Sequence, residues 1–108
     1  MVCLIENEED FEAKLKQAGG QLVVLDFFAE WCGPCKTIAP TFEEFAKKYT
    51  NVIFYKVDVD AAGEVAEKCN VTSMPTFVFF KNGQQVGIII GGGQENVTKL
   101  EKMIKTLE

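Results

Sequence analysis

The chain has 108 residues, 47% of them hydrophobic, and its eleven basic and sixteen acidic residues give a net charge of −5. This length fits one domain, residues 1–108, with a single core and no separate substrate domain. The negative charge disfavours nucleic acid and anionic membranes as partners. No stretch approaches the ~20 apolar residues of a membrane span, and no basic leader or apolar signal core begins the chain, so we expect a cytoplasmic protein.

The first half of the chain alternates short apolar runs with helical patterns. Residues 2–5 are typical of an edge strand, and apolar residues at helical spacing predict a helix over 11–18. The run LVVLDFFA at 22–29 is almost continuously apolar, which is typical of a strand buried on both faces and therefore of a central, parallel strand. A second helical pattern over 38–49 contains a proline that should kink it, and a strand follows over 52–60.

The second half predicts a short helix over 65–69 and a strand over 75–80. Asn82-Gly83 is typical of a hairpin turn, so the next strand, 86–90, should run antiparallel to the one before it. A glycine triplet ends that strand, and an apolar stripe predicts a last helix over 97–107. The predicted order is β-α-β-α-β-α-β-β-α, an α/β fold with a central mixed sheet and helices on both faces.

Residues 29–36 read AEWCGPCK, and the cysteine pair within them can be interpreted in several ways. A zinc or iron-sulfur site needs four ligands, but the chain has no histidine and only two further thiols, Cys3 and Cys69, so we expect no metal. A structural disulfide across so short a loop contributes only roughly 2 kcal/mol. Two small buried hydrophobic residues one helical turn apart remain as an inert alternative.

Redox chemistry accounts best for the neighbours of the pair. Cys32 falls between a buried strand and an amphipathic helix, so we expect it at the helix N-terminus, where unpaired backbone N–H groups favour a thiolate. Pro34 suits a first helical turn, and Gly33 leaves space for a substrate backbone. Cys35, one turn further in, is placed to attack a mixed disulfide at Cys32. The pattern predicts an accessible, reactive Cys32 and a buried, slower Cys35.

The motif WCGPCK, with Asp26 before it and Met74-Pro75-Thr76 after it, resembles the thioredoxin family, and the match runs essentially end to end. The resemblance implies the thioredoxin fold and a thiol–disulfide oxidoreductase of cell redox homeostasis, which carries electrons to protein disulfides through a redox-active Cys32–Cys35 disulfide. The Gly-Pro between the cysteines favours a general reductant over an oxidase or isomerase.

The resemblance also implies partners. Thioredoxin reductase would recycle the cysteine pair with NADPH, which is the cofactor of that partner, so we expect none bound to this chain. Implied substrates are disulfide-containing proteins such as peroxiredoxins, ribonucleotide reductase and methionine sulfoxide reductase. The alternative class is a non-catalytic binding module on the same fold. Such modules often lose a cysteine or the proline of the Met-Pro pair, and this chain keeps both.

A carboxylate within LVVLDFFA is unusual, because burying its charged form is costly. The resemblance implies that Asp26 is a buried acid behind Cys35 and relays a proton to or from that thiol. A strand end that reaches solvent is the alternative. Lys56 matches a position where some members of the family place a lysine near this acid, although the family does not fix that residue.

The resemblance further implies a substrate groove beside the cysteines. Sequence alone predicts a trans Met74-Pro75 bond, since only about 5% of such bonds are cis, whereas the family places a cis proline here. Trp31 would form an apolar rim, although its residue type fits a core position equally well. The implied groove residues are Trp31, Gly33, Pro34, Asp60, Met74, Pro75, Thr76, Gly91 and Gly92.

The remaining cysteines have no predicted catalytic role. Cys69 lies on the apolar side of a short helix and is interpreted as an inert core thiol, and Cys3 is assigned no role. Some animal thioredoxins carry a regulatory cysteine directly before the Met-Pro pair, but this chain has Ser73 there, so we expect a monomer. Two Asn-x-Thr sequons, at Asn70 and Asn96, are interpreted as chance matches.

Overall fold

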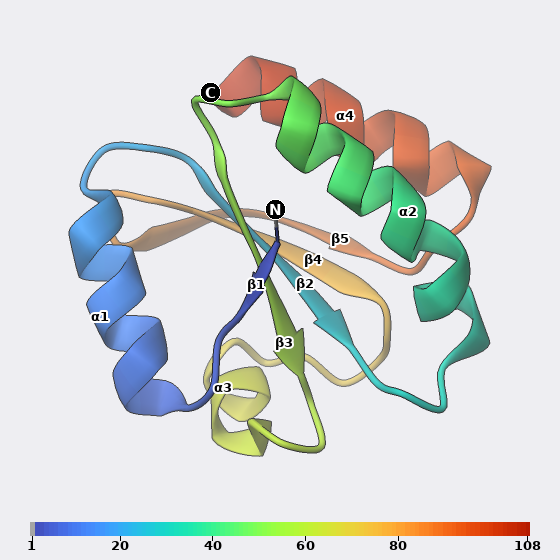
Figure 1. Ribbon diagram of the computed structural model, residues 1–108, viewed down its shortest axis with the longest axis horizontal. Helices are drawn as coiled ribbons and strands as arrows, with labels where there is room; N and C mark the ends of the chain where they lie inside the picture. Colours follow the sequence, from blue (N-terminus) through green and yellow to red (C-terminus); the bar gives the residue numbers. More distant parts are fainter. Residues whose placement is uncertain (1) are drawn as a thin grey trace.

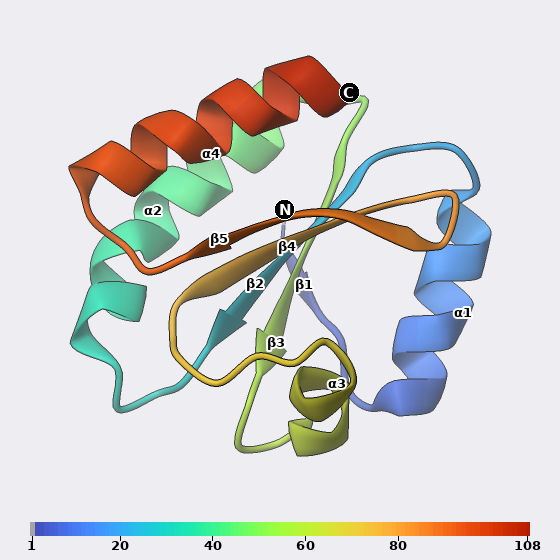
Figure 2. The same cartoon turned by 180° about the vertical axis from the view of Figure 1, so that it is seen from behind.

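The computed structural model describes residues 2–108, which form one five-stranded sheet between two pairs of helices (Figures 1 and 2). The predicted order of strands and helices is confirmed. The elements are β1 (Cys3–Leu4), α1 (Glu8–Ala18), β2 (Val23–Phe28), α2 (Gly33–Lys48), β3 (Ile53–Asp58), α3 (Gly63–Lys68), β4 (Thr76–Lys81), β5 (Gln84–Ile90) and α4 (Gln94–Leu107). Within residues 2–108, no helix combines the length and the apolar character needed to cross a membrane.

The strands lie in the order β1-β3-β2-β4-β5, so β2 is central, as its apolar run predicts. The expectation that β2 is a parallel strand is only half correct, because β2 runs parallel to β3 and antiparallel to β4. Burial on both faces results from the helices that cover the sheet, and the central strand of a mixed sheet is buried in the same way as that of a parallel sheet. The predicted hairpin is confirmed, with φ of +55° at Asn82 and +75° at Gly83 in the turn between antiparallel β4 and β5.

Two cores lie on the two faces of the sheet. Helices α2 and α4 cover one face, and α1 and α3 cover the other (Figure 1). Side chains of a strand alternate between faces, and Val24 of β2 lies in the α2/α4 core while Leu25 lies in the α1/α3 core. Asp26 is therefore directed toward α2, although its neighbours on both sides belong to the opposite core.

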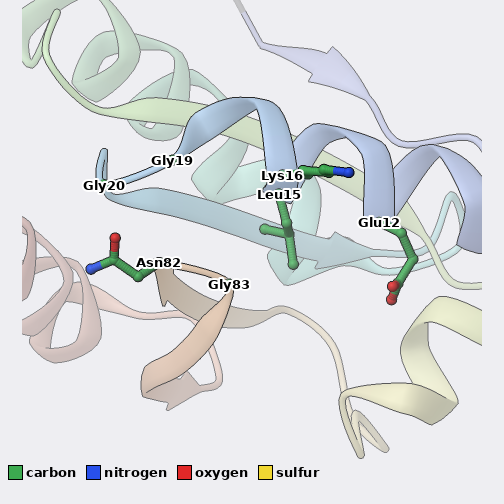
Figure 3. A pocket seen from close by; sticks show the side chains of 7 residues that line it. All are labelled: Glu12, Leu15, Lys16, Gly19, Gly20, Asn82 and Gly83. Atoms are coloured by element: carbon green, nitrogen blue, oxygen red, sulfur yellow. The ribbon is translucent and has the colours of Figure 1, made fainter.

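A hollow in the surface and the cysteine pair lie at opposite ends of β2. At the end where β2 begins, the last turn of α1 and the β4–β5 turn border a hollow of about 440 Å³ (Figure 3). Its lining residues are Glu12, Leu15, Lys16, Gly19, Gly20, Asn82 and Gly83. None of them carries a thiol or a nucleophilic hydroxyl group. The cysteine pair lies beyond the other end of β2, where α2 begins.

Candidate active site

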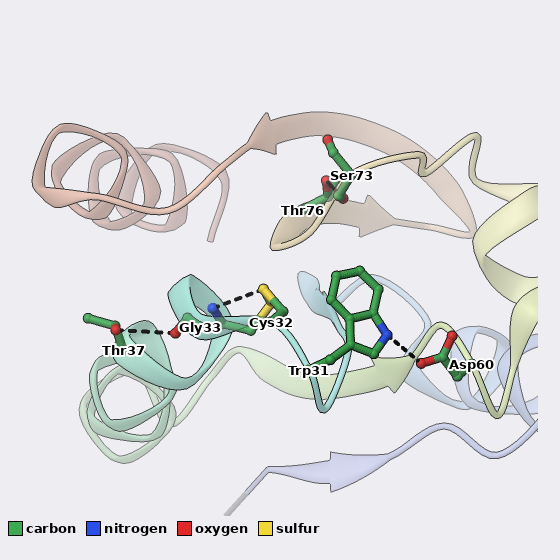
Figure 4. The surroundings of a disulfide bond; sticks show 8 residues. Trp31, Cys32, Gly33, Thr37, Asp60, Ser73 and Thr76 are labelled. Atoms are coloured by element: carbon green, nitrogen blue, oxygen red, sulfur yellow. Dashed lines mark hydrogen bonds between the residues drawn. A yellow bond between two sulfur atoms is a disulfide. The ribbon is translucent and has the colours of Figure 1, made fainter.

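Cys32 and Cys35 form a disulfide across the first turn of α2, with their Cα atoms 5.3 Å apart (Figure 4). Cys32 is the N-cap residue of the helix, and its Sγ accepts a hydrogen bond from the backbone N–H of Cys35 at 3.2 Å. Pro34 lies in the first turn, where it has no intrahelical N–H to lose. The predicted position of the pair at a helix N-terminus is confirmed.

The exposure of the two cysteines differs from the prediction. Cys32 is 5% exposed and Cys35 is 4% exposed, so both are buried in the disulfide form. Both residues belong to one small buried cluster with Ala29, against which Phe28, Val59 and Met74 pack. The two cysteines nevertheless have different surroundings. Cys35, and not Cys32, lines a hollow of about 310 Å³ that Asp26 also lines.

Asp26 is buried, with 4% of its surface exposed, so the alternative of a solvated strand end is wrong. Among the described residues, nothing hydrogen-bonds its Oδ1 atom. Desolvation by burial raises the pKa of Asp26 from 3.8 to about 7, and the positive charge of Lys56 opposes this rise. Lys56 is the register partner of Asp26 on β3 and borders the same hollow, which explains its influence. The carboxyl group can therefore take up or release a proton near neutral pH.

Trp31 is 69% exposed, so it does not belong to the core. Its indole Nε1–H donates a hydrogen bond to Oδ2 of Asp60 at 3.0 Å (Figure 4). Asp60 in turn donates its backbone N–H to Oδ1 of Asp58 at 2.9 Å, within the turn that follows β3. This pairing brings together two predicted site residues that are 29 positions apart in the sequence. The result is a large apolar surface held beside the disulfide.

A groove of about 770 Å³ reaches the first turn of α2 at Pro34, which lies between the two cysteines in sequence, although neither cysteine lines it. Its lining residues are Pro34, Thr37, Ile38, Thr41, Met74, Pro75, Gly91, Gly92, Gly93, Gln94 and Val97. The Met74-Pro75 peptide bond is cis, as the resemblance implies and sequence alone does not. The backbone N–H of Gly91 donates to the carbonyl oxygen of Pro75 at 2.8 Å, which joins the end of β5 to this loop.

Gly92 lies close to two prolines of the groove. A Cβ atom at this position would lie 3.4 Å from Cγ of Pro75 and 3.7 Å from Cβ of Pro34, which is ordinary van der Waals contact, so the backbone of Gly92 lies against both prolines. Thr76 is buried instead, and its hydroxyl group donates to the carbonyl oxygen of Ser73 at 2.6 Å. Thr76 thus supports the loop before β4 from within.

Sequence reasoning missed the part of the groove that α2 forms, the part formed by Gly93, Gln94 and Val97, and the contact of Asn96 that lies behind it. Thr37, Ile38 and Thr41 line it from α2, and their spacing from Pro34 is that of one helix face, which could have indicated them. Asn96 donates its side-chain amide to the carbonyl oxygens of Ile90 and Gly91. No local sequence pattern indicates this contact, because it joins two different elements, the first turn of α4 and the end of β5.

The other two cysteines lie away from the groove. Cys69 is buried in the α1/α3 core, and burial raises the pKa of its thiol to about 11, with a small opposing effect of Lys68. This agrees with the interpretation of an inert core thiol. Cys3 is a free, exposed cysteine in β1. Over residues 2–108, no group of three or more His, Cys, Asp or Glu side chains is arranged to hold a metal ion.

Comparisons with known proteins agree with this geometry. The Thioredoxin family model matches residues 2–106. The human protein "Thioredoxin" is 51% identical over 107 residues, which cover 99% of each chain. The crystal structure of Fasciola hepatica thioredoxin superposes with a TM-score of 0.94 and 44% identity over the whole of both chains. A chain from a structural study of thiol resolution in yeast mitochondrial 1-Cys peroxiredoxin by glutathione and thioredoxin systems gives a TM-score of 0.89 at 42% identity, covering 98% of this chain and 95% of that one.

A disulfide-forming cysteine pair at a helix N-terminus, beside a buried carboxyl group on this fold, defines a disulfide reductase with a redox-active centre. The chain belongs to the thioredoxin family. It is a thiol–disulfide oxidoreductase that acts by dithiol–disulfide exchange through Cys32 and Cys35. The alternative, a non-catalytic binding module, is not favoured.

Proposed function

We propose that the chain works as a single domain, residues 1–108, in which Cys32 is the nucleophile and Cys35 the resolving thiol. The Cys32 thiolate attacks one sulfur of a protein disulfide, which forms a mixed disulfide and releases the other substrate sulfur as a thiolate. Cys35 then attacks Sγ of Cys32, which releases the second substrate thiolate and leaves the Cys32–Cys35 disulfide. Two electrons pass to the substrate, and two protons complete its thiols.

The observation that carries this assignment of roles is that Cys32 and Cys35 have different surroundings. Cys32 caps the helix, where backbone N–H groups stabilise a thiolate, whereas Cys35 shares a hollow with Asp26. The Asp26 carboxylate would accept the proton of Cys35 as that thiol attacks, because a carboxyl group with a pKa of about 7 is an effective base near neutral pH. Asp26 is therefore proposed as the proton relay of the resolving step.

Insulin reduction with dithiothreitol tests these roles. Cys32→Ser should abolish activity, whereas Cys35→Ser should accumulate a mixed disulfide with insulin through Cys32, visible by mass spectrometry without reductant. Cys69→Ser is the matched control, since it removes a buried thiol that no step uses. Retained activity in Cys32→Ser, or a mixed disulfide trapped by Cys32→Ser and not by Cys35→Ser, would contradict the assignment.

Substrate docking is proposed along the groove and the exposed indole. An extended substrate segment would pair with the backbone beside Pro75, with Gly91 and Gly92 at its flank. Met74 and Pro34 would contact its side chains, Gly33 would leave room for its backbone, and Thr76 would hold the loop in place. Trp31, oriented by Asp60, would cover the opposite side of the disulfide. Support comes from Pro34, which lies between the two cysteines in sequence and lines the groove, and from the 69% exposure of Trp31.

The proposed electron path runs from NADPH through thioredoxin reductase to this chain and then to protein disulfides in the cytoplasm, with no cofactor bound here. Peroxiredoxins are the substrates with the most specific support, because one similar structure comes from a study of peroxiredoxin resolution by thioredoxin systems. Ribonucleotide reductase and methionine sulfoxide reductase are proposed as further targets. Covalent trapping from lysate with Cys35→Ser, against Cys32→Ser as control, would identify the targets. Gel filtration at several concentrations would test the proposed monomer.

A further inference from the structure

Asn96 lies in the first turn of α4, but its side chain bonds to β5 and not to its own helix. Its Nδ2 atom donates to the carbonyl oxygens of Ile90 and Gly91, each at 3.0 Å. Gly91 also donates its N–H to the carbonyl oxygen of Pro75 at 2.8 Å. One amide group thus connects α4, through the end of β5, to the loop that carries Pro75. The connection between β5 and α4 lies beside the first turns of α2 in both views (Figures 1 and 2).

The segment that Asn96 holds has unusual conformational freedom. Residues 91–93 are three consecutive glycines, and Gly91 and Gly93 have φ of +99° and +104°. Glycine has more backbone conformations to lose than any other residue, so such a segment is costly to order. Among the hydrogen bonds of the described residues, those of Asn96 are the only ones from a side chain to the backbone of residues 90–93. Two backbone hydrogen bonds also hold this segment, from Gly91 to Pro75 and from Val97 to Gly93, and Asn96 adds the side-chain contribution.

Helix capping does not explain the contact. The first turn of α4 needs acceptors for its unpaired N–H groups, but the N-cap residue is Gly93, which provides no side-chain cap. Asn96 directs its amide nitrogen, a donor, at two carbonyl oxygens outside the helix. Both carbonyl dipoles point at this one nitrogen, and Asn96 is half-buried, so water replaces the donor incompletely.

We propose that Asn96 is a positioning residue for protein substrates: its side-chain amide fixes the backbone at Ile90 and Gly91 and thereby holds the groove wall at Gly92 in the form that docks an extended polypeptide. This role rests on the proposed docking groove. It concerns binding and not sulfur chemistry, because Asn96 bonds to the groove backbone and not to either cysteine. A defect should therefore appear with protein disulfides and not with a small reagent that reaches Cys32 alone.

The sharpest variant is Asn96→Asp, which keeps the shape of the side chain but replaces the donor by a carboxylate that repels both carbonyl oxygens. Pre-reduced protein is mixed with increasing insulin, and oxidation of the Cys32–Cys35 pair is followed by acid quench and mass spectrometry. We expect the half-saturating insulin concentration to rise about 3- to 10-fold, the range for loss of a partly buried hydrogen bond, with a limiting rate within about 2-fold of wild type. The rate of Cys32 alkylation by iodoacetamide should not change.

Thr98→Ala is the matched control. Thr98 lies in the same turn of α4 and donates its hydroxyl group to the carbonyl oxygen of Gln94, so its removal deletes a similar bond away from residues 90–93. Asn96→Ala serves as a second variant if the aspartate variant fails to fold, which urea unfolding will detect. An unchanged half-saturating concentration in a folded variant, or an equal loss with insulin and iodoacetamide, would overturn the positioning role alone. Failure of the wild-type protein to reduce insulin would overturn the proposed function and this role with it.

Discussion

Replacing Asp26 by alanine should make the protein more stable at neutral pH, because the folded state keeps this carboxyl group in an environment that resists its ionisation. The pKa of Asp26 is about 7 in the folded protein against an ordinary value of 3.8. This difference corresponds to about 4 kcal/mol of lost stability once the group is ionised in both states. Alanine removes that cost but leaves a small hole, which costs about 1 kcal/mol at every pH. The expected net gain is therefore about 3 kcal/mol.

The sign of the pH dependence follows from the raised pKa. Below pH 4 both folded and unfolded chains hold the proton on Asp26, and its ionisation costs nothing. Between pH 4 and pH 7 the unfolded chain releases the proton while the folded chain retains it, so the stability of the wild-type protein falls as pH rises. The loss is complete above pH 7. The alanine variant should thus be slightly less stable than wild type near pH 4 and more stable at pH 7 to 8.

Urea unfolding of the oxidised proteins, measured at intervals from pH 4 to pH 8, tests this prediction. The informative quantity is the difference in unfolding free energy between variant and wild type as a function of pH, because other titrating groups cancel in it. Asp26→Asn is the matched control, since it also removes the titration, and its difference from the alanine variant should not depend on pH. If the difference in unfolding free energy between wild type and the alanine variant does not change with pH, burial does not raise the pKa of Asp26 and the prediction is wrong.

Three further predictions concern the cysteines and the tryptophan. In the reduced protein, a brief pulse of iodoacetamide should modify Cys32 before Cys35, because only Cys32 is the N-cap of α2, and equal modification in peptide maps would contradict the assigned roles. In the oxidised protein at pH 8, Cys3 should be modified and Cys69 should not react until the protein is unfolded, since burial raises the pKa of Cys69 to about 11; native labelling of Cys69 would refute its inert role. Trp31 emission should change on reduction because the indole lies beside the disulfide, and identical spectra of the two states would count against this placement (Figure 4).

The elements and their order could be predicted because each rests on a local pattern. The run at 22–29 has no polar interruption except Asp26, and the structure places it at the centre of the sheet. Asn82-Gly83 predicted an antiparallel hairpin, since few other residue pairs adopt two successive positive φ values, and the turn has them. The direction of β2 relative to β4 could not be predicted from its own residues. It depends on how the loop after α3 returns to the sheet.

The site was predictable to the extent that its residues are close in sequence. Cys32, Pro34 and Cys35 lie in one helical turn, so their spacing alone placed them together. The burial of Cys32 could not be predicted in this way, because it depends on packing with residues outside the helical turn, among them Val59 and Met74. The contact of Trp31 with Asp60 could not be predicted from residue type, because Trp31 fitted a core position equally well, and the family resemblance implied only that both residues belong to the groove.

The role proposed for Asn96 could not be predicted from the sequence. In the printed sequence it forms part of an Asn-x-Thr sequon and of the first turn of a helix, and neither pattern indicates a substrate groove. The role proposed for it rests on two carbonyl groups that only the folded chain brings to its amide. Side chains that bond to backbone carry no pairing pattern of their own, because every residue offers a carbonyl oxygen.

The stability and the chemistry of this protein are linked through one buried group. The alternation of β2 directs Asp26 toward α2, and the helical turn that separates Cys32 from Cys35 places Cys35, but not Cys32, at the hollow that Asp26 lines. The same desolvation that lowers stability at neutral pH raises the proton affinity of the carboxylate to the range in which it can serve as a base for Cys35. Lys56 limits both effects, since its charge favours the ionised form. A carboxyl group that cost the fold nothing would be a weaker base, so the instability at Asp26 is the physical requirement of its proposed role.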